Sequence, residues 1–181
     1  MILITGLGNI GAEYENTRHN CGFRALDRLQ MQLRHTQGLT VSDWTEEKIF
    51  YSQISKIRRG GDIVAILQKP TTFMNLSGRA VKGVYEKFDI KTFILIHDDL
   101  DIKLGEYKIQ DAKSPLGHNG VLSVEQALGT TKFKRVRIGI EARDGKEIPG
   151  EEYVICRFRK EEELLVDEAI SKAIDEILLL F

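Results

Sequence analysis

Two short runs of almost unbroken apolar residues, at positions 63–67 and 93–96, constrain the fold more than any other feature of this chain. A strand with one face in water alternates apolar and polar residues, whereas a strand covered on both faces is apolar throughout. The stretches 21–33 and 78–88 instead place apolar residues at helical spacing. Buried strands that alternate with amphipathic helices are typical of an α/β domain.

The same patterns extend this architecture along the chain. They predict strands at 2–5 and 49–57 and a closing amphipathic helix at 161–181. The alternation at 135–140 turns three aliphatic side chains towards the core and leaves Arg135 and Arg137 on a face that can meet solvent or phosphate. We therefore expect a single catalytic α/β domain over residues 1–181, with a twisted mixed, largely parallel sheet flanked by helices.

The charge balance limits the kinds of partner. With 26 Lys and Arg against 27 Asp and Glu, the net charge of -1 gives no overall attraction to RNA. Any RNA site must be local, and positive charge gathers at Lys103, Lys108, Lys113 and residues 132–137. No stretch is apolar and long enough to span a bilayer, and the first residues lack a signal-peptide pattern. We expect a cytoplasmic protein in which Cys21 and Cys156 stay separate thiols.

Gly6, Gly8 and Gly11 follow the first strand with the spacing of a dinucleotide-binding turn. Such a site also needs its third glycine to open a helix, and an acid about 20 residues further on at the end of a second strand. Here the loop continues through residues 17–20. The acid closest to the required spacing, Asp27, lies within the expected helix and not at the end of a strand. The glycine pattern alone therefore gives little support to a nucleotide cofactor.

Polar clusters follow the apolar runs at several places in the chain. They are Asn9 with residues 17–20, then 73–75, 97–101 and 117–120. Each cluster alone is readily explained as a turn or a helix cap. Because sites in α/β sheets gather beyond the carboxyl ends of the strands, we expect the clusters to meet there.

The residue types in these clusters suit hydrolysis of an activated acyl bond. A histidine takes a proton from water near neutral pH, and a carboxylate on its other nitrogen fixes the tautomer. Asparagine amides hold a developing oxyanion without titrating. An ester could be cut by this set without a metal or a covalent intermediate.

Other mechanisms remain open at this point. Ser77 and Ser123 lie near the clusters, but the Gly-x-Ser-x-Gly elbow of a serine hydrolase is missing from the sequence. Cys21 is two residues from His19 and could form a thiolate pair with it. A metal could be held by His97, Asp98, Asp99 and Asp101.

The clusters closely resemble the motifs of the bacterial peptidyl-tRNA hydrolase family, in the same order and over nearly the whole chain. The matching segments are 6–11 with Tyr14 and 17–20, 69–75 with Ser77 and Gly78, 97–101, 117–120 and 137–140. The resemblance implies an α/β enzyme that cuts the ester between peptide and tRNA. It implies no cofactor, and a monomer whose partner is peptidyl-tRNA.

The resemblance also implies the role of each residue. His19 matches the proton acceptor, Asp98 the carboxylate that hydrogen-bonds to it, and Asn9 the residue that distinguishes a blocked from a free amino group. The residues that match peptide and 3′-end contacts are Tyr14, Phe73, Met74, Asn75, His118 and Asn119. Lys108 and Arg137 match cations of a phosphate clamp.

The chain departs from the family pattern at Ile10, usually proline, and at Leu116 and Glu141, usually glycine. Gln110 stands where the phosphate clamp has a basic residue. These changes affect the affinity for tRNA more than the chemistry.

Two rival functions are a noncatalytic RNA-binding protein, as in the organelle splicing branch that the family resembles, and a nucleotide-dependent oxidoreductase. The intact His19 and Asp98 argue against pure binding, which needs no base.

Overall fold

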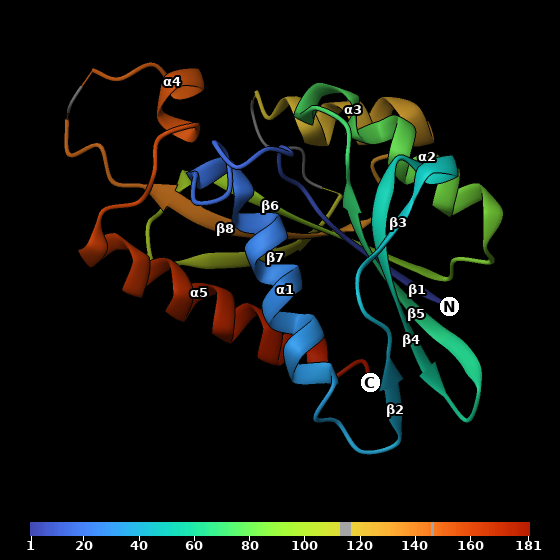
Figure 1. Ribbon diagram of the computed structural model, residues 1–181. Helices are drawn as coiled ribbons and strands as arrows, with labels where there is room; N and C mark the ends of the chain where they lie inside the picture. Colours follow the sequence, from blue (N-terminus) through green and yellow to red (C-terminus); the bar gives the residue numbers. More distant parts are fainter. Residues whose placement is uncertain (113–116, 146) are drawn as a thin grey trace.

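The computed structural model describes residues 1–112, 117–145 and 147–181. Helices and strands alternate through most of the chain (Figure 1). The strands are β1 Ile2–Gly6, β2 Leu39–Val41, β3 Thr45–Glu47, β4 Ser52–Arg59, β5 Asp62–Pro70, β6 Thr92–Lys103, β7 Tyr107–Asp111 and β8 Lys134–Glu141. The helices are α1 Cys21–Leu33, α2 Ser77–Lys87, α3 Asn119–Leu128, α4 Gly150–Val154 and α5 Lys160–Leu178, with short 3-10 turns η1 Arg18–Asn20, η2 Lys48–Phe50 and η3 Met74–Leu76.

One mixed sheet forms the centre of the described structure. Its strand order is β2-β4-β5-β1-β6-β8-β7, and β3 pairs with β4 beside this path. The central strands β5, β1, β6 and β8 run parallel, while β4 and β7 join them antiparallel at the two sides. The expected α/β class with a mixed sheet and flanking helices is confirmed, with the parallel part confined to the middle.

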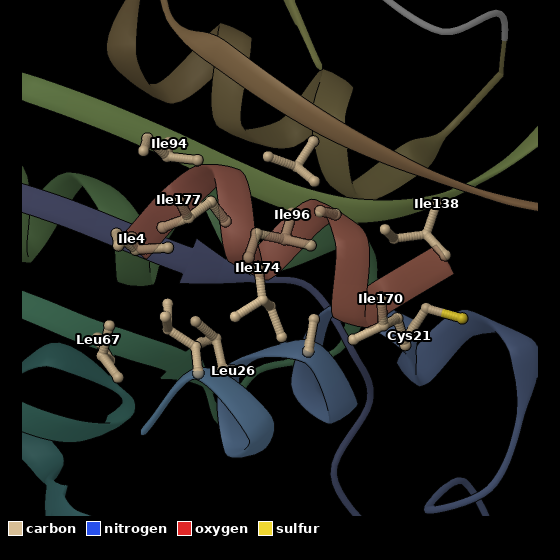
Figure 2. Close-up of a cluster of buried hydrophobic side chains, with 14 of the residues drawn as sticks. Ile4, Cys21, Leu26, Leu67, Ile94, Ile96, Ile138, Ile170, Ile174 and Ile177 are labelled. Carbon is tan, nitrogen blue, oxygen red and sulfur yellow. The ribbon is translucent and has the colours of Figure 1, made fainter. Parts of the chain in front are cut away.

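Helices cover both faces of the sheet (Figure 1). On one face, α1 and α5 enclose a core with Ile4, Ile94, Ile96 and Ile138 of the central strands (Figure 2). On the other face, α2 and α3 pack on a second buried cluster that includes Leu95. Burial on both faces explains why the central strands are almost wholly apolar.

Two glycines allow the start of α1 to approach the end of β1 and the middle of β6. A Cβ on Gly6 would lie 2.2 Å from the backbone oxygen of Gly22, and a Cβ on Gly22 would lie 2.5 Å from the carbonyl oxygen of Ile96. Neither position has room for a side chain. Because both residues lack a side chain, the residues just before α1 lie next to the middle of β6.

Several expected boundaries were wrong. Residues 97–101 lie within β6 and not after it, because the pairing of β6 with β8 continues through Asp99 and resumes at Lys103. The strand at 63–67 extends to Pro70, whose partner is Ser52 of β4. The strand expected at 49–57 begins only at Ser52, because Tyr51 adopts a left-handed conformation with φ 48° after η2.

The prediction from the alternation in β8 was confirmed for the aliphatic residues and wrong for the arginines. Val136, Ile138 and Ile140 are buried in the core that includes α5, as expected. Arg135 and Arg137, however, are only 0% and 4% exposed and do not face solvent. Acidic side chains of neighbouring elements form ion pairs with them. Burial of these two cations changes where an RNA-binding surface can lie.

Two other expectations concern the thiols and the membrane. Cys21 is buried and Cys156 is exposed, and the two are separate free thiols, as expected. None of the helices in the described ranges combines the length and apolar character that crossing a membrane requires.

Candidate active site

A cavity of about 730 Å³ lies at the carboxyl ends of β1 and β6, where the polar clusters were expected to meet. Its lining comes from β6, from loops that follow other strands, and from α4 and Ile155. The predicted site residues that line it are Asn9, His19, Phe73, Met74, Asn75, Asp98, His118 and Asn119. Segments more than 100 residues apart in sequence therefore converge on one cavity.

His19 and Asp98 form a close polar contact in the cavity. The His19 Nδ1 atom lies 2.9 and 3.0 Å from the two carboxylate oxygens of Asp98, and Asp98 is 1% exposed. Burial by itself lowers the pKa of His19, but the charge and hydrogen bond of Asp98 together outweigh burial and raise it above 6.5. Burial opposes ionisation of Asp98, yet the nearby His19 and His118 hold the pKa of its carboxyl group well below its usual range.

His118 contacts the same carboxylate from the N-terminus of α3. Its Nε2 lies 3.2 Å from Asp98 Oδ1, and its Nδ1 accepts a hydrogen bond of 3.3 Å from the backbone N–H of Val121. Because a backbone N–H only donates, Nδ1 carries the lone pair and Nε2 carries the proton. Asp98 therefore accepts hydrogen bonds from two histidines.

Asn9 is held with its amide group in a defined orientation. The Asn20 side chain bonds both to the Asn9 N–H, at 2.8 Å, and to the Asn9 carbonyl oxygen, at 3.0 Å. Asn9 Oδ1 accepts the Met74 N–H at 2.9 Å, which fixes which end of the amide is oxygen. Within the described residues, no acceptor takes Asn9 Nδ2, so its two protons are available to a molecule in the cavity.

The cysteine and metal alternatives fit this geometry less well. Burial raises the pKa of Cys21 well above its usual value, which disfavours a thiolate. His19, Asp98 and His118 place three potential ligand atoms within 4.8 Å of one another. A metal would need a lone pair on His118 Nε2, where the hydrogen bond from Val121 places the proton. The cluster is therefore better explained as a hydrogen-bond network. His97, Asp99 and Asp101 do not join it among the described residues.

Comparison with known proteins identifies the family of this chain. The profile of the peptidyl-tRNA hydrolase family matches residues 3–181. The chain belongs to the peptidyl-tRNA hydrolase family. It is 38% identical to the peptidyl-tRNA hydrolase of Ligilactobacillus salivarius and 40% identical to that of Bacillus cytotoxicus, each over 96% of this chain and 89% of the relative. The crystal structure of the Acinetobacter baumannii peptidyl-tRNA hydrolase covers 99% of this chain and 88% of its own, with 30% identity and a TM-score of 0.84.

Membership of the peptidyl-tRNA hydrolase family makes the chain a hydrolase and removes the dinucleotide interpretation of Gly6, Gly8 and Gly11. In the structure, residues after Gly11 form a loop up to η1 and open no helix there. Gly6 and Gly8 instead allow close packing on α1, against Gly22 and Phe23, and Gly11 has a positive φ of 117°.

Three of the predicted substrate contacts lie outside the cavity. Tyr14 is half-buried in the loop before η1 and does not line the cavity. Lys108 is exposed on the edge strand β7. Arg137 is buried, with Nε 2.6 Å from Asp99 Oδ2 and Nη1 2.6 Å from Gln110 Oε1. Of the two family-matched cations, only Lys108 is thus exposed. Lys113 and Leu116 lie outside the described residues.

Sequence reasoning missed the mostly apolar wall of the cavity. This wall contains Leu100 of β6 and, from α4 and its end, Gly150, Glu151, Val154 and Ile155. The local signals for α4 are Pro149 directly before it and the acidic Glu151 and Glu152 in its first turn. Five residues are too few to carry a clear helical period.

Proposed function

We propose that this peptidyl-tRNA hydrolase cuts the ester bond between peptide and tRNA with His19 as general base, and that Asp98 orients it. The observation that carries the proposal is the contact of His19 Nδ1 with both oxygens of buried Asp98. That contact places the proton of neutral His19 on Nδ1 and leaves the lone pair of Nε2 for the cavity.

The proposed reaction needs no covalent intermediate. Water attacks the ester carbonyl carbon while His19 Nε2 takes its proton, and Asp98 stabilises the imidazolium ion that forms. The oxyanion of the tetrahedral intermediate is held by the Nδ2 group of Asn9, and Asn75 and Asn119 also line the cavity. The ester C–O bond then breaks, and His19 returns the proton to the ribose oxygen of the released tRNA.

The cavity supports recognition of the peptidyl part of the substrate. A blocked amino group is an uncharged amide, which fits asparagine side chains and the apolar wall of Leu100, Val154 and Ile155. A free amino group is a cation, whose loss of hydration in the cavity costs more than that of an amide, and Asp98 is already engaged by two histidines. The enzyme is therefore proposed to act on N-blocked substrates and to spare aminoacyl-tRNA.

The proposal extends to the form of the enzyme. Residues 1–181 act as one catalytic domain, a monomer in the cytoplasm, where peptidyl-tRNA arises during translation. Binding of tRNA relies on local cations such as the exposed Lys108, because the net charge is -1.

The test is incubation of the enzyme with N-acetyl-aminoacyl-tRNA and with the same aminoacyl-tRNA bearing a free amine. Cleavage of the first at a rate at least about 10²-fold above that of the second is expected. An Asn9→Ala variant should lose much of this preference. Binding of both RNAs without release of the acyl group would instead favour a noncatalytic RNA-binding protein.

A further inference from the structure

Arg18, the residue directly before His19, is almost completely buried, with 3% of its surface exposed. Its guanidinium group crosses to the segment between α4 and α5. Nη2 lies 2.6 Å from Glu162 Oε2, and Nη1 donates to the carbonyl oxygens of Arg157 at 2.5 Å and Cys156 at 3.3 Å. The Arg18 backbone N–H also donates to the Cys156 carbonyl oxygen, at 3.1 Å. One residue therefore ties η1 to this segment through both backbone and side chain.

Aromatic rings enclose the same guanidinium group. Its central carbon lies 4.3 Å from the ring centre of Tyr153 and 4.8 Å from that of Phe158. Tyr153 belongs to α4, and its hydroxyl group donates to the Ile140 carbonyl oxygen at the end of β8. The contacts of Arg18 thus reach α4 itself and, through Tyr153, the carboxyl end of the sheet.

The partner Glu162 is fixed independently. Its Oε2 accepts the Arg159 N–H at 2.7 Å, and its Oε1 accepts from the Arg159 side chain at 2.9 Å, so that it closes a capping box at the start of α5. Arg18 is therefore anchored to the rigid first turn of a 19-residue helix. The contact with Glu162 therefore fixes the position of the Arg18 guanidinium group as well as balancing its charge.

These contacts join two parts of the cavity lining that are far apart in sequence. One is His19, and the other is Val154 and Ile155. We propose that Arg18 is a positioning residue for hydrolysis, which holds the base and the α4 wall of the substrate cavity at a fixed separation. This inference rests on the proposed role of His19.

The proposed reaction requires a fixed distance between His19 and the α4 wall. Water attack requires the ester carbonyl, held against the α4 wall and the asparagines, to lie within reach of water bound at His19 Nε2. A displacement of about 1 Å in such an arrangement costs about 10²-fold in rate. Substrate binding depends on the walls more than on their separation from the base, so loss of the link affects kcat more than KM.

The test compares Arg18→Met and Arg18→Lys with Arg135→Met. Arg135 is also buried, is paired with Glu125 at 2.5 Å and lies over a phenylalanine ring, but does not line the cavity. Steady-state kinetics with N-acetyl-aminoacyl-tRNA are measured well below the melting temperature of each variant. We expect kcat to fall about 10²-fold in Arg18→Met, and less in Arg18→Lys, which keeps the charge facing Glu162 but loses the guanidinium fork. KM should change less than threefold.

Two further readouts separate positioning from stability. Arg135→Met should lose thermal stability as Arg18→Met does, yet keep kcat within about twofold. In Arg18→Met, the apparent pKa of the pH–kcat/KM profile should move down, because a displaced His19 loses contact with Asp98. If both Arg18 variants keep wild-type kcat and pH profile, the inference is overturned, and if Arg18→Met does not fold, Arg18→Lys decides alone. Full activity of His19→Ala would instead reject the proposed function itself.

Discussion

Asp98 and Asp99 are neighbours on β6, are both buried and have different partners. Asp98 accepts hydrogen bonds from His19 and His118, and it raises the pKa of His19 above its usual value. Asp99 pairs with Arg137, which is always protonated. One carboxylate can therefore take part in proton transfer, while its neighbour holds two strands of the sheet together. The residue type is the same, and the partner decides the role.

The largest difference between the two carboxylates should appear in kcat. Asp98→Asn should lower kcat by about 10²–10⁴-fold, because the amide can present its NH₂ group to His19 Nδ1 and favour the tautomer that lacks a lone pair on Nε2. Asp99→Asn should lower kcat less than tenfold. Rates for both variants under single-turnover conditions check the comparison, and equal losses would remove the distinction drawn between the neighbours.

The free energy of unfolding should instead depend strongly on the pair of Asp99 and Arg137. Arg137→Met leaves the buried Asp99 without its cation, and removal of one member of a buried pair costs about 3–5 kcal/mol in the free energy of unfolding. Adding Asp99→Asn to Arg137→Met should restore part of that loss, since the uncompensated charge disappears. Urea unfolding of the single and double variants measures this coupling. Simple additivity of the two losses would show that the pair is not coupled.

This contrast also explains what the sequence could and could not predict. The apolar runs and the helical periods placed the central strands, α1, α2 and α5, because burial fixes their patterns. The polar clusters correctly indicated that His19 and Asp98 come to one cavity. The sequence alone did not reveal that Arg137 is neutralised by Asp99, because that pairing depends on the register between β6 and β8.

The unpredicted parts share a physical cause. Residues 97–101 look like a loop because they are polar, but the ladder with β8 holds them in a strand. The α4 wall is too short for a period, and its position depends on Tyr153 and Arg18, which come together only in the folded chain. Tertiary contacts therefore decided these segments, and local preference did not.

The pH dependence of kcat/KM should reflect the contact of His19 with Asp98 and not the pair of Asp99 and Arg137. Because the pKa of His19 is raised above 6.5, and the base acts when neutral, kcat/KM should rise with pH through an apparent pKa above 6.5. The same contact stabilises protonated His19, so its contribution to folding is complete below 6.5 and is lost as pH rises through the raised pKa. In Asp98→Asn the apparent pKa should fall. An unchanged inflection would mean that another group titrates.

The smallest effects are expected at the exposed edge of β7, beyond the Asp99–Arg137 pair. Lys108→Met should lower the salt dependence of tRNA binding by about one unit in the slope of log K against log salt, and Gln110→Lys should raise it by about one. Neither should change kcat at saturating substrate more than about twofold. Filter binding at several salt concentrations checks both, and identical slopes in all three proteins would place the RNA contacts elsewhere.

The role of His19 as the base is tested most directly by the hydrolysis rate of N-acetyl-aminoacyl-tRNA by His19→Ala, at saturating enzyme and in a single turnover, with circular dichroism to verify folding. A folded variant that has lost about 10²–10⁴-fold in rate, and whose remaining activity no longer follows the wild-type pH inflection, is the expected result. A folded variant that cleaves at the wild-type rate would contradict the account.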